Sequence, residues 1–256
     1  MHTWYAALTL AGLLALSGCS RDAAEPAPLP VGAVGDCYAK ASKAVDCAAP
    51  HLAETVFVAQ ETPPRTPAAI APCQTSQARY LGQDFNTRLD VHLWVASDES
   101  WYRCDVVLPK STHTDSGLET VTGSLRGALR NGVPVELQAC LGEQHDQAID
   151  QPYTSCDTPH KSRRLIVAPA VGTVAEPFPA DIADRATRAC NASAAAEREL
   201  VGSPRVQAFF PDSAAAWDTG DRSADCWVVA DSGLLPAVTP ANVDSREEPT
   251  GPATNK

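Results

Sequence analysis

Apolar and polar residues alternate in short runs along most of the chain, which is the pattern of strands in a sheet with one buried face. In the first half the runs VGDCY, AVDC and TVFVAQ precede a helical stretch at residues 69–81, and LDVHLWVA and SWYRCDVVL follow it. The second half repeats this order with VELQAC, PYTSCD and RRLIVAPAV, a helical stretch at residues 179–200, then RVQAFF and DCWVVAD. This order predicts the α+β class, with one helix packed on an antiparallel sheet in each half.

Eight cysteines strengthen the prediction of two similar units, because they fall into two sets of four with similar surroundings. The second cysteine of each set opens the pattern C-x-x-P-H, which ends at His51 and at His160. The third lies in the helical stretch, and the fourth lies near tryptophan in a strand-like run. We therefore expect a duplication, with a first unit at 31–110, a connector at 111–132 and a second unit at 133–235.

Eight cysteines allow 105 disulfide connectivities, and the sequence does not prove one of them. If each unit closes internally, pairing the first cysteine with the second and the third with the fourth needs the least crossing of the chain. Each such bridge would stabilise the fold by about 3–4 kcal/mol in the chain-entropy description. The expected pairs are Cys37 with Cys47, Cys73 with Cys104, Cys140 with Cys156, and Cys190 with Cys226.

The two ends of the chain differ in composition from the units. Residues 4–16 form an uncharged, mostly apolar run that ends in LSGC at residues 16–19, which is typical of a bacterial lipoprotein signal. We expect a signal peptide at 1–18, lipidation of Cys19 and an extended tether at 19–30 rich in Pro and Ala. The stretch 236–256 has few large apolar residues, and we expect a disordered tail there.

Charge and cysteine content narrow the class of protein. The 256 residues include 20 Lys and Arg against 31 Asp and Glu, a formal charge of −11, so the basic surface that nucleic acid requires is absent. Nine cysteines beside one methionine indicate an oxidising compartment. The chain is therefore expected on the extracytoplasmic side of the cell membrane, held by its lipid.

The repeated C-x-x-P-H pattern is the strongest candidate for chemistry. A c-type haem needs a second cysteine where proline stands here, and neither a C-x-x-C redox motif nor a G-x-S-x-G elbow occurs. A metal site built from Cys47, His51 and Glu54 competes with a structural turn, and we favour the turn because Glu54 has no acidic counterpart after His160. We expect no catalytic residue, no metal and no cofactor.

The tryptophans have two interpretations: core residues that cover the disulfides, which we favour, or an aromatic platform for a sugar or a partner protein. They lie in or beside the runs that carry the fourth cysteines: Trp94, Trp101, Trp217 and Trp227. Our candidates for a surface or binding role are His51, Glu54, His160, Trp94 and Trp101.

Several segments together carry a resemblance to a known family. VGDCY, AVDCAAPHLAETVFVAQ, LWVASDESWYRCDVVL and GSLRGAL, behind a lipoprotein signal and before a weaker second copy, resemble the septum formation family of actinobacterial envelope proteins. Residues 37–60 are the most specific part. The resemblance implies an envelope protein connected with assembly of the division septum, with no catalytic residues to transfer.

Three hypotheses for the function follow. The first is a membrane-tethered, non-catalytic interaction module that contacts a protein partner at the cell envelope during septum formation and cell division. The second is an envelope enzyme such as a wall-polymer hydrolase. The third is a lipoprotein that binds a small ligand or a metal.

Overall fold

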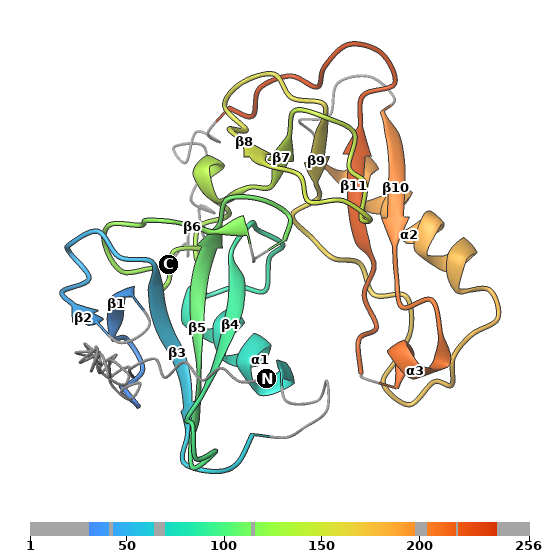
Figure 1. Ribbon diagram of the computed structural model, residues 1–256. Helices are drawn as coiled ribbons and strands as arrows, with labels where there is room; N and C mark the ends of the chain where they lie inside the picture. Colours follow the sequence, from blue (N-terminus) through green and yellow to red (C-terminus); the bar gives the residue numbers. More distant parts are fainter. Residues whose placement is uncertain are drawn as a thin grey trace, which may run out of the picture.

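The computed structural model describes residues 31–40, 43–63, 70–113, 116–197, 204–218 and 220–239. They form two antiparallel sheets, each accompanied by a helix, and Figure 1 shows the blue-to-green half beside the yellow-to-red half. The predicted α+β class with two similar units is confirmed. The expected signal peptide and tether lie outside the described residues.

The first sheet has the strand order β2–β1–β3–β5–β4, and the short strand β6 pairs with β5. Helix α1 lies between β3 and β4 in the sequence, as the hydrophobic pattern predicts. The elements are β1 (Cys37–Lys40), β2 (Lys43–Val45), β3 (Ala53–Ala59), α1 (Ile70–Leu81), β4 (Asp90–Val95), β5 (Tyr102–Pro109) and β6 (Leu118–Glu119).

The second sheet, read from β8, has the order β8–β7–β9–β11–β10. This is the order of the first sheet with each strand replaced by its counterpart, so the duplication is visible in the topology itself. A short helix, α3, has no counterpart among the described residues of the first unit. The elements are a 3₁₀ turn (Val135–Leu137), β7 (Cys140–Leu141), β8 (Tyr153–Thr154), β9 (Ser162–Arg164), α2 (Ile182–Ala196), β10 (Arg205–Phe209), α3 (Ala214–Trp217) and β11 (Asp225–Val229).

The strand that carries the fourth cysteine is the centre of each core. Every residue of β5 is buried, and its alternate side chains Cys104, Val106 and Leu108 join the cluster under α1. In the second unit Cys226 and Val228 join the cluster under α2 in the same way. The alternation follows from the pleat of a strand, which sends successive side chains to opposite faces.

Local sequence explains how α2 packs on its sheet and how α1 ends. Helix α2 buries Ala186, Cys190 and Ala194 at a spacing of four, so small side chains face the sheet. Helix α1 ends at Gly82, which has φ of 100° and donates its N–H to the carbonyl of Ala78 at 2.9 Å. Glycine is favoured there because other residues are strained in the left-handed region.

The four disulfides have the expected pairing, and each lies within one unit. Two of them join the helix to the central strand across sequence separations of 31 and 36 residues, so they fasten each helix to its sheet. The bridges are Cys37–Cys47, Cys73–Cys104, Cys140–Cys156 and Cys190–Cys226.

Two predicted boundaries are wrong. The stretch 111–132 is no mere connector, because Leu125 and Leu129 are buried in the core of the first unit. The tail does not begin at 236, because Val238 is buried against the Cys140–Cys156 bridge and donates its N–H to the carbonyl of Cys156 at 2.7 Å. In both units the chain after the central strand returns to complete the core, which hydrophobic spacing alone does not show. The expected tail from 240 onward lies outside the described residues.

Among the described residues, no helix combines the length and the apolar character that a bilayer crossing requires.

Candidate functional site

The two C-x-x-P-H histidines are buried and occupy equivalent places. His51 is 0% exposed and His160 is 1% exposed. Their Nδ1 atoms lie 2.9 Å from the carbonyl oxygen of Ala49 and 2.8 Å from that of Thr158. Because a carbonyl only accepts, each Nδ1 is the protonated nitrogen. Burial lowers the pKa of His160, with the hydrogen bond to Thr158 opposing it.

The backbone of each histidine also forms an isolated β-bridge with the returning chain. His51 exchanges hydrogen bonds of 2.9 and 2.8 Å with Val121, and His160 exchanges bonds of 3.2 and 2.7 Å with Leu235. The repeated motif is therefore a structural turn that attaches the last segment of each unit. Both side chains are buried and not on the surface, in agreement with the structural turn favoured from the sequence.

Glu54, the third candidate, is likewise buried rather than on the surface. Its carboxylate accepts hydrogen bonds from the hydroxyls of Tyr80 and Ser124 and from the N–H of Leu125, the last at 2.7 Å. These donors belong to α1 and to the returning loop. Glu54 on β3 therefore joins three segments of the first unit.

A pair of opposite charge occupies the equivalent place in the second unit. Arg163 lies three residues after its histidine, as Glu54 does, and Glu197 lies seven residues after the helical cysteine, as Tyr80 does. Nη2 of Arg163 lies 2.9 Å from Oε2 of Glu197. The strand-to-helix contact is thus conserved between the units while its chemistry differs.

The potential ligand atoms of the hypothetical metal site are already engaged in other bonds. Across the described ranges, one group of three potential ligands lies within 4.8 Å, formed by Cys37, Cys47 and Glu54. Both sulfurs are bonded to each other, and metal ligation needs free thiolates. The Glu54 oxygens already accept three hydrogen bonds, so this donor set does not fit a metal in the oxidised protein.

The two candidate tryptophans differ in exposure. Trp101 is 8% exposed, which agrees with the favoured interpretation of a core residue and not with a surface platform. Trp94 is partly buried on the edge strand β4, and its ring lies 5.0 Å from the ring of His92. Neither these tryptophans nor His51 and His160 line the pocket described next.

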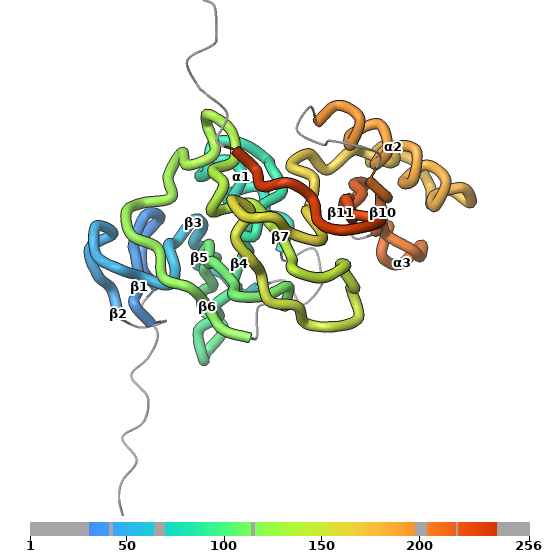
Figure 2. The backbone as a smooth tube through the Cα atoms, turned by 90° about the horizontal axis from the view of Figure 1, so that it is seen from above, coloured from blue at the N-terminus to red at the C-terminus, as the bar shows by residue number. Residues whose placement is uncertain are grey.

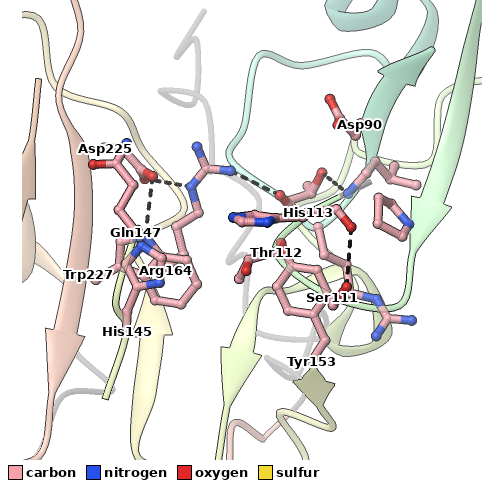
Figure 3. Close-up of a pocket in the computed structure, with 14 residues that line it drawn as sticks. Asp90, Ser111, Thr112, His113, His145, Gln147, Tyr153, Arg164, Asp225 and Trp227 are labelled. Atoms are coloured by element: carbon pink, nitrogen blue, oxygen red, sulfur yellow. Dashed lines mark hydrogen bonds and ion pairs between the residues drawn. The ribbon is translucent and has the colours of Figure 1, made fainter. Parts of the chain in front are cut away.

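That pocket lies where the two units meet and has a volume of about 260 Å³. Both units contribute to its lining, as Figure 3 shows for the labelled side chains. Apart from Trp227, none of the lining residues was singled out in the sequence, because they come from separate loops and strands. The lining consists of Thr87, Arg88, Leu89, Asp90, Pro109, Ser111, Thr112, His113, His145, Gln147, Tyr153, Arg164, Asp225 and Trp227.

Backbone hydrogen bonds between the units hold the rim of the pocket. The N–H of Asn86 donates to the carbonyl of Ile166 at 2.7 Å, and the N–H of Tyr153 donates to the carbonyl of Lys110 at 2.9 Å. Figure 2 shows the two halves in contact from above. Hydrogen bonds between the backbones of the two units, and not side chains alone, therefore hold the walls of the pocket together.

Paired charges line the pocket. Nε of Arg164 lies 2.6 Å from Oδ1 of Asp225, and Nη1 donates to the carbonyl of Thr87 at 3.2 Å. The indole N–H of Trp227 donates to Oδ2 of Asp225 at 3.2 Å. This network, visible on the left of Figure 3, presets the orientation of the Arg164 guanidinium.

Two rings of the second unit, one on β8 and one in the loop before it, stay neutral near pH 7. Burial raises the pKa of Tyr153 to about 12, so its hydroxyl remains protonated. Burial lowers the pKa of His145, which stacks on Trp227 with ring centroids 4.1 Å apart and is 6% exposed. No other described residue hydrogen-bonds its Nδ1.

Buried polar side chains also pack together on the first sheet. Nε of Arg103 lies 3.1 Å from Oδ2 of Asp105, and Thr55 donates to the same carboxylate at 2.7 Å. Tyr38 covers the guanidinium, whose Cζ lies 4.0 Å from the ring centroid. Burial raises the pKa of Asp105, with Thr55 and Arg103 opposing it.

These features define a disulfide-bonded protein made of two copies of one α+β unit, with a polar pocket where the copies meet. Residues 33–226 match the family described as septum formation, and the chain belongs to that family. The resemblance inferred from the cysteine segments is thereby confirmed. Neither a curated protein nor a solved structure matches the chain.

Proposed function

We propose that this protein is a lipid-anchored, extracytoplasmic component of septum formation that acts by stoichiometric, non-catalytic contact with another envelope protein. Membership of the family connects the chain with septum formation. The observation that carries the proposal of a non-catalytic role is the use of His51, Glu54 and His160 in internal contacts. These residues stabilise turns and join segments of a rigid body that can present a surface.

The anchor is the other half of the proposal. The sequence LSGC at 16–19 supplies Cys19 for acylation, and each buried acyl CH₂ contributes about 0.8 kcal/mol of membrane affinity. The eleven or so residues that follow, when extended, reach at most about 35 Å. The net charge of −11 favours a partner surface that is basic or neutral.

The anchor is tested by replacing Cys19 with Ala and partitioning cell extracts between detergent and aqueous phases. The variant should move to the aqueous phase, while a Ser20→Ala control should stay in the detergent phase. Retention of the Cys19→Ala protein with the membrane would overturn the lipid anchor.

The role in septum formation is tested with a fusion to a fluorescent protein that matures after export. The fusion should concentrate at division septa, and crosslinking in intact cells should capture one protein partner in stoichiometric amount. A uniform distribution over the membrane would contradict the septal role. Loss of function in a His51→Gln protein that still folds would contradict the non-catalytic role.

A further inference from the structure

The pocket between the units combines aromatic, guanidinium and carboxylate groups in its lining. Tyr153 provides a partly exposed aromatic ring, Arg88 and Arg164 provide guanidinium groups, and the carboxylates come from acidic residues in each unit. Trp227 also lines the pocket, but it is 2% exposed and its ring stacks on His145. Figure 3 shows Tyr153, Arg164, Asp90 and Asp225 around a common space. The ligand must therefore offer an apolar face as well as both hydrogen-bond donors and acceptors.

The size of the pocket limits the ligand to a small molecule or to one residue of a polymer. Its volume of about 260 Å³ lies just below the roughly 300–1,000 Å³ of sites for drug-sized ligands. A single sugar ring is of suitable size, and longer chains could continue outside the opening.

The internal charge pairs argue for a ligand without net charge. Arg164 is already paired with Asp225 and Arg88 with Glu119, so a charged ligand would have to compete with a partner held in place. A hydroxyl does not need to break these pairs. It donates to a carboxylate oxygen and accepts from a guanidinium N–H at the same time.

Two nitrogens in the pocket wall add to its polar character. His145 is 6% exposed and lines the pocket, and no other described residue hydrogen-bonds its Nδ1. Nε of Arg88 is also buried and without a hydrogen bond among the described residues. Both atoms are enclosed by the protein, so the contacts to a ligand come instead from the accessible guanidinium, carboxylate and hydroxyl groups of the lining.

From these observations we propose that the pocket binds one ring of a neutral saccharide. The apolar face of the ring packs on the exposed part of Tyr153, and its hydroxyls bind the paired charges on either side. The inference depends on the pocket alone, so it stands or falls separately from the septal role and from the lipid anchor.

The test uses the mature protein in a polyoxyethylene detergent, which carries no sugar that would compete. A glycan array with neutral and acidic members is screened, and each hit is titrated calorimetrically beside free alanine and inorganic phosphate. At least one neutral glycan should bind, and its monosaccharide should compete. Binding of acidic glycans, alanine or phosphate alone would overturn the proposal, as would an array with no bound neutral glycan.

Two variants locate the binding. Asp225→Asn removes a charged acceptor, and Gln147→Ala truncates an exposed lining residue without disturbing the core. Each should raise the dissociation constant, Asp225→Asn by about tenfold or more. The matched control is Asp231→Asn, beyond the other end of β11, where the carboxylate lies 3.8 Å from Arg205 and outside the pocket. Unchanged affinity in both pocket variants, or equal weakening in the control, would refute binding at this place.

Discussion

The carboxylate of Glu54 offers the sharpest test of how the first unit is held together. It accepts hydrogen bonds from Tyr80 on α1 and from Ser124 and Leu125 on the returning loop, and it is fully buried. Replacing Glu54 with Ala removes the common acceptor of three donors, of which Tyr80 and the N–H of Leu125 are buried, while the Ser124 hydroxyl is exposed and can bind water. Helix, strand and loop should loosen together.

The magnitude follows from the number of donors left without a partner. Each unsatisfied buried donor costs about 1–3 kcal/mol, while removal of the carboxylate relieves its own desolvation. We expect a net loss of about 3–5 kcal/mol in the free energy of unfolding, in line with other broken buried networks. For a folded body of this size a loss of about 4 kcal/mol corresponds to a fall of roughly 8–16 °C in Tm.

The assay is denaturant unfolding of the oxidised protein followed by circular dichroism. Glu61→Ala is the matched control, since Glu61 is exposed just after β3 and its removal should change stability by less than about 0.5 kcal/mol. Tyr80→Phe should cost less than Glu54→Ala, and the double variant should cost less than their sum because the two groups share a bond. A Glu54→Ala protein within 1 kcal/mol of the natural one would refute the reasoning.

Three further predictions concern the Cys73–Cys104 disulfide, the Arg163–Glu197 ion pair and the titration of His160. Replacing Cys73 and Cys104 together by Ala should lower the free energy of unfolding by about 3–4 kcal/mol, and a loss below 1 kcal/mol would contradict the value from chain entropy. Arg163→Met removes the guanidinium from Glu197, which keeps its hydrogen bond from the N–H of Ile166, and should cost about 2–3 kcal/mol, seen as faster hydrogen exchange in α2; unchanged exchange there would speak against the contact. The pKa of His160 is lowered by burial from its ordinary 6.5, so the unfolded chain binds the proton first as pH falls. Stability is then full above pH 6.5 and declines as pH falls toward the folded pKa, and an imidazole titrating above 6.5 by NMR would show the sign to be wrong.

The sequence by itself determined the duplication and favoured the disulfide pairing that the structure has. Both follow from local information: strand alternation and helical stretches report burial along one element, and two copies of a four-cysteine pattern restrict which pairs are compatible. The family could also be inferred from local information, because the segment around Cys37 and Cys47 that carries the resemblance is contiguous in the sequence.

Only the tertiary structure showed which contacts the candidate polar residues His51 and Glu54 make, and where the pocket lies. His51 and Glu54 are residue types that often bind metals or transfer protons. Their partners, Val121 and Tyr80, come from distant segments of the chain, so the spacing of residues in the sequence does not reveal that they are buried. The pocket depends on how one unit docks on the other, through backbone hydrogen bonds that any sequence can make. Periodicity describes how a segment faces its own core, whereas the docking of two finished units leaves no period in the chain.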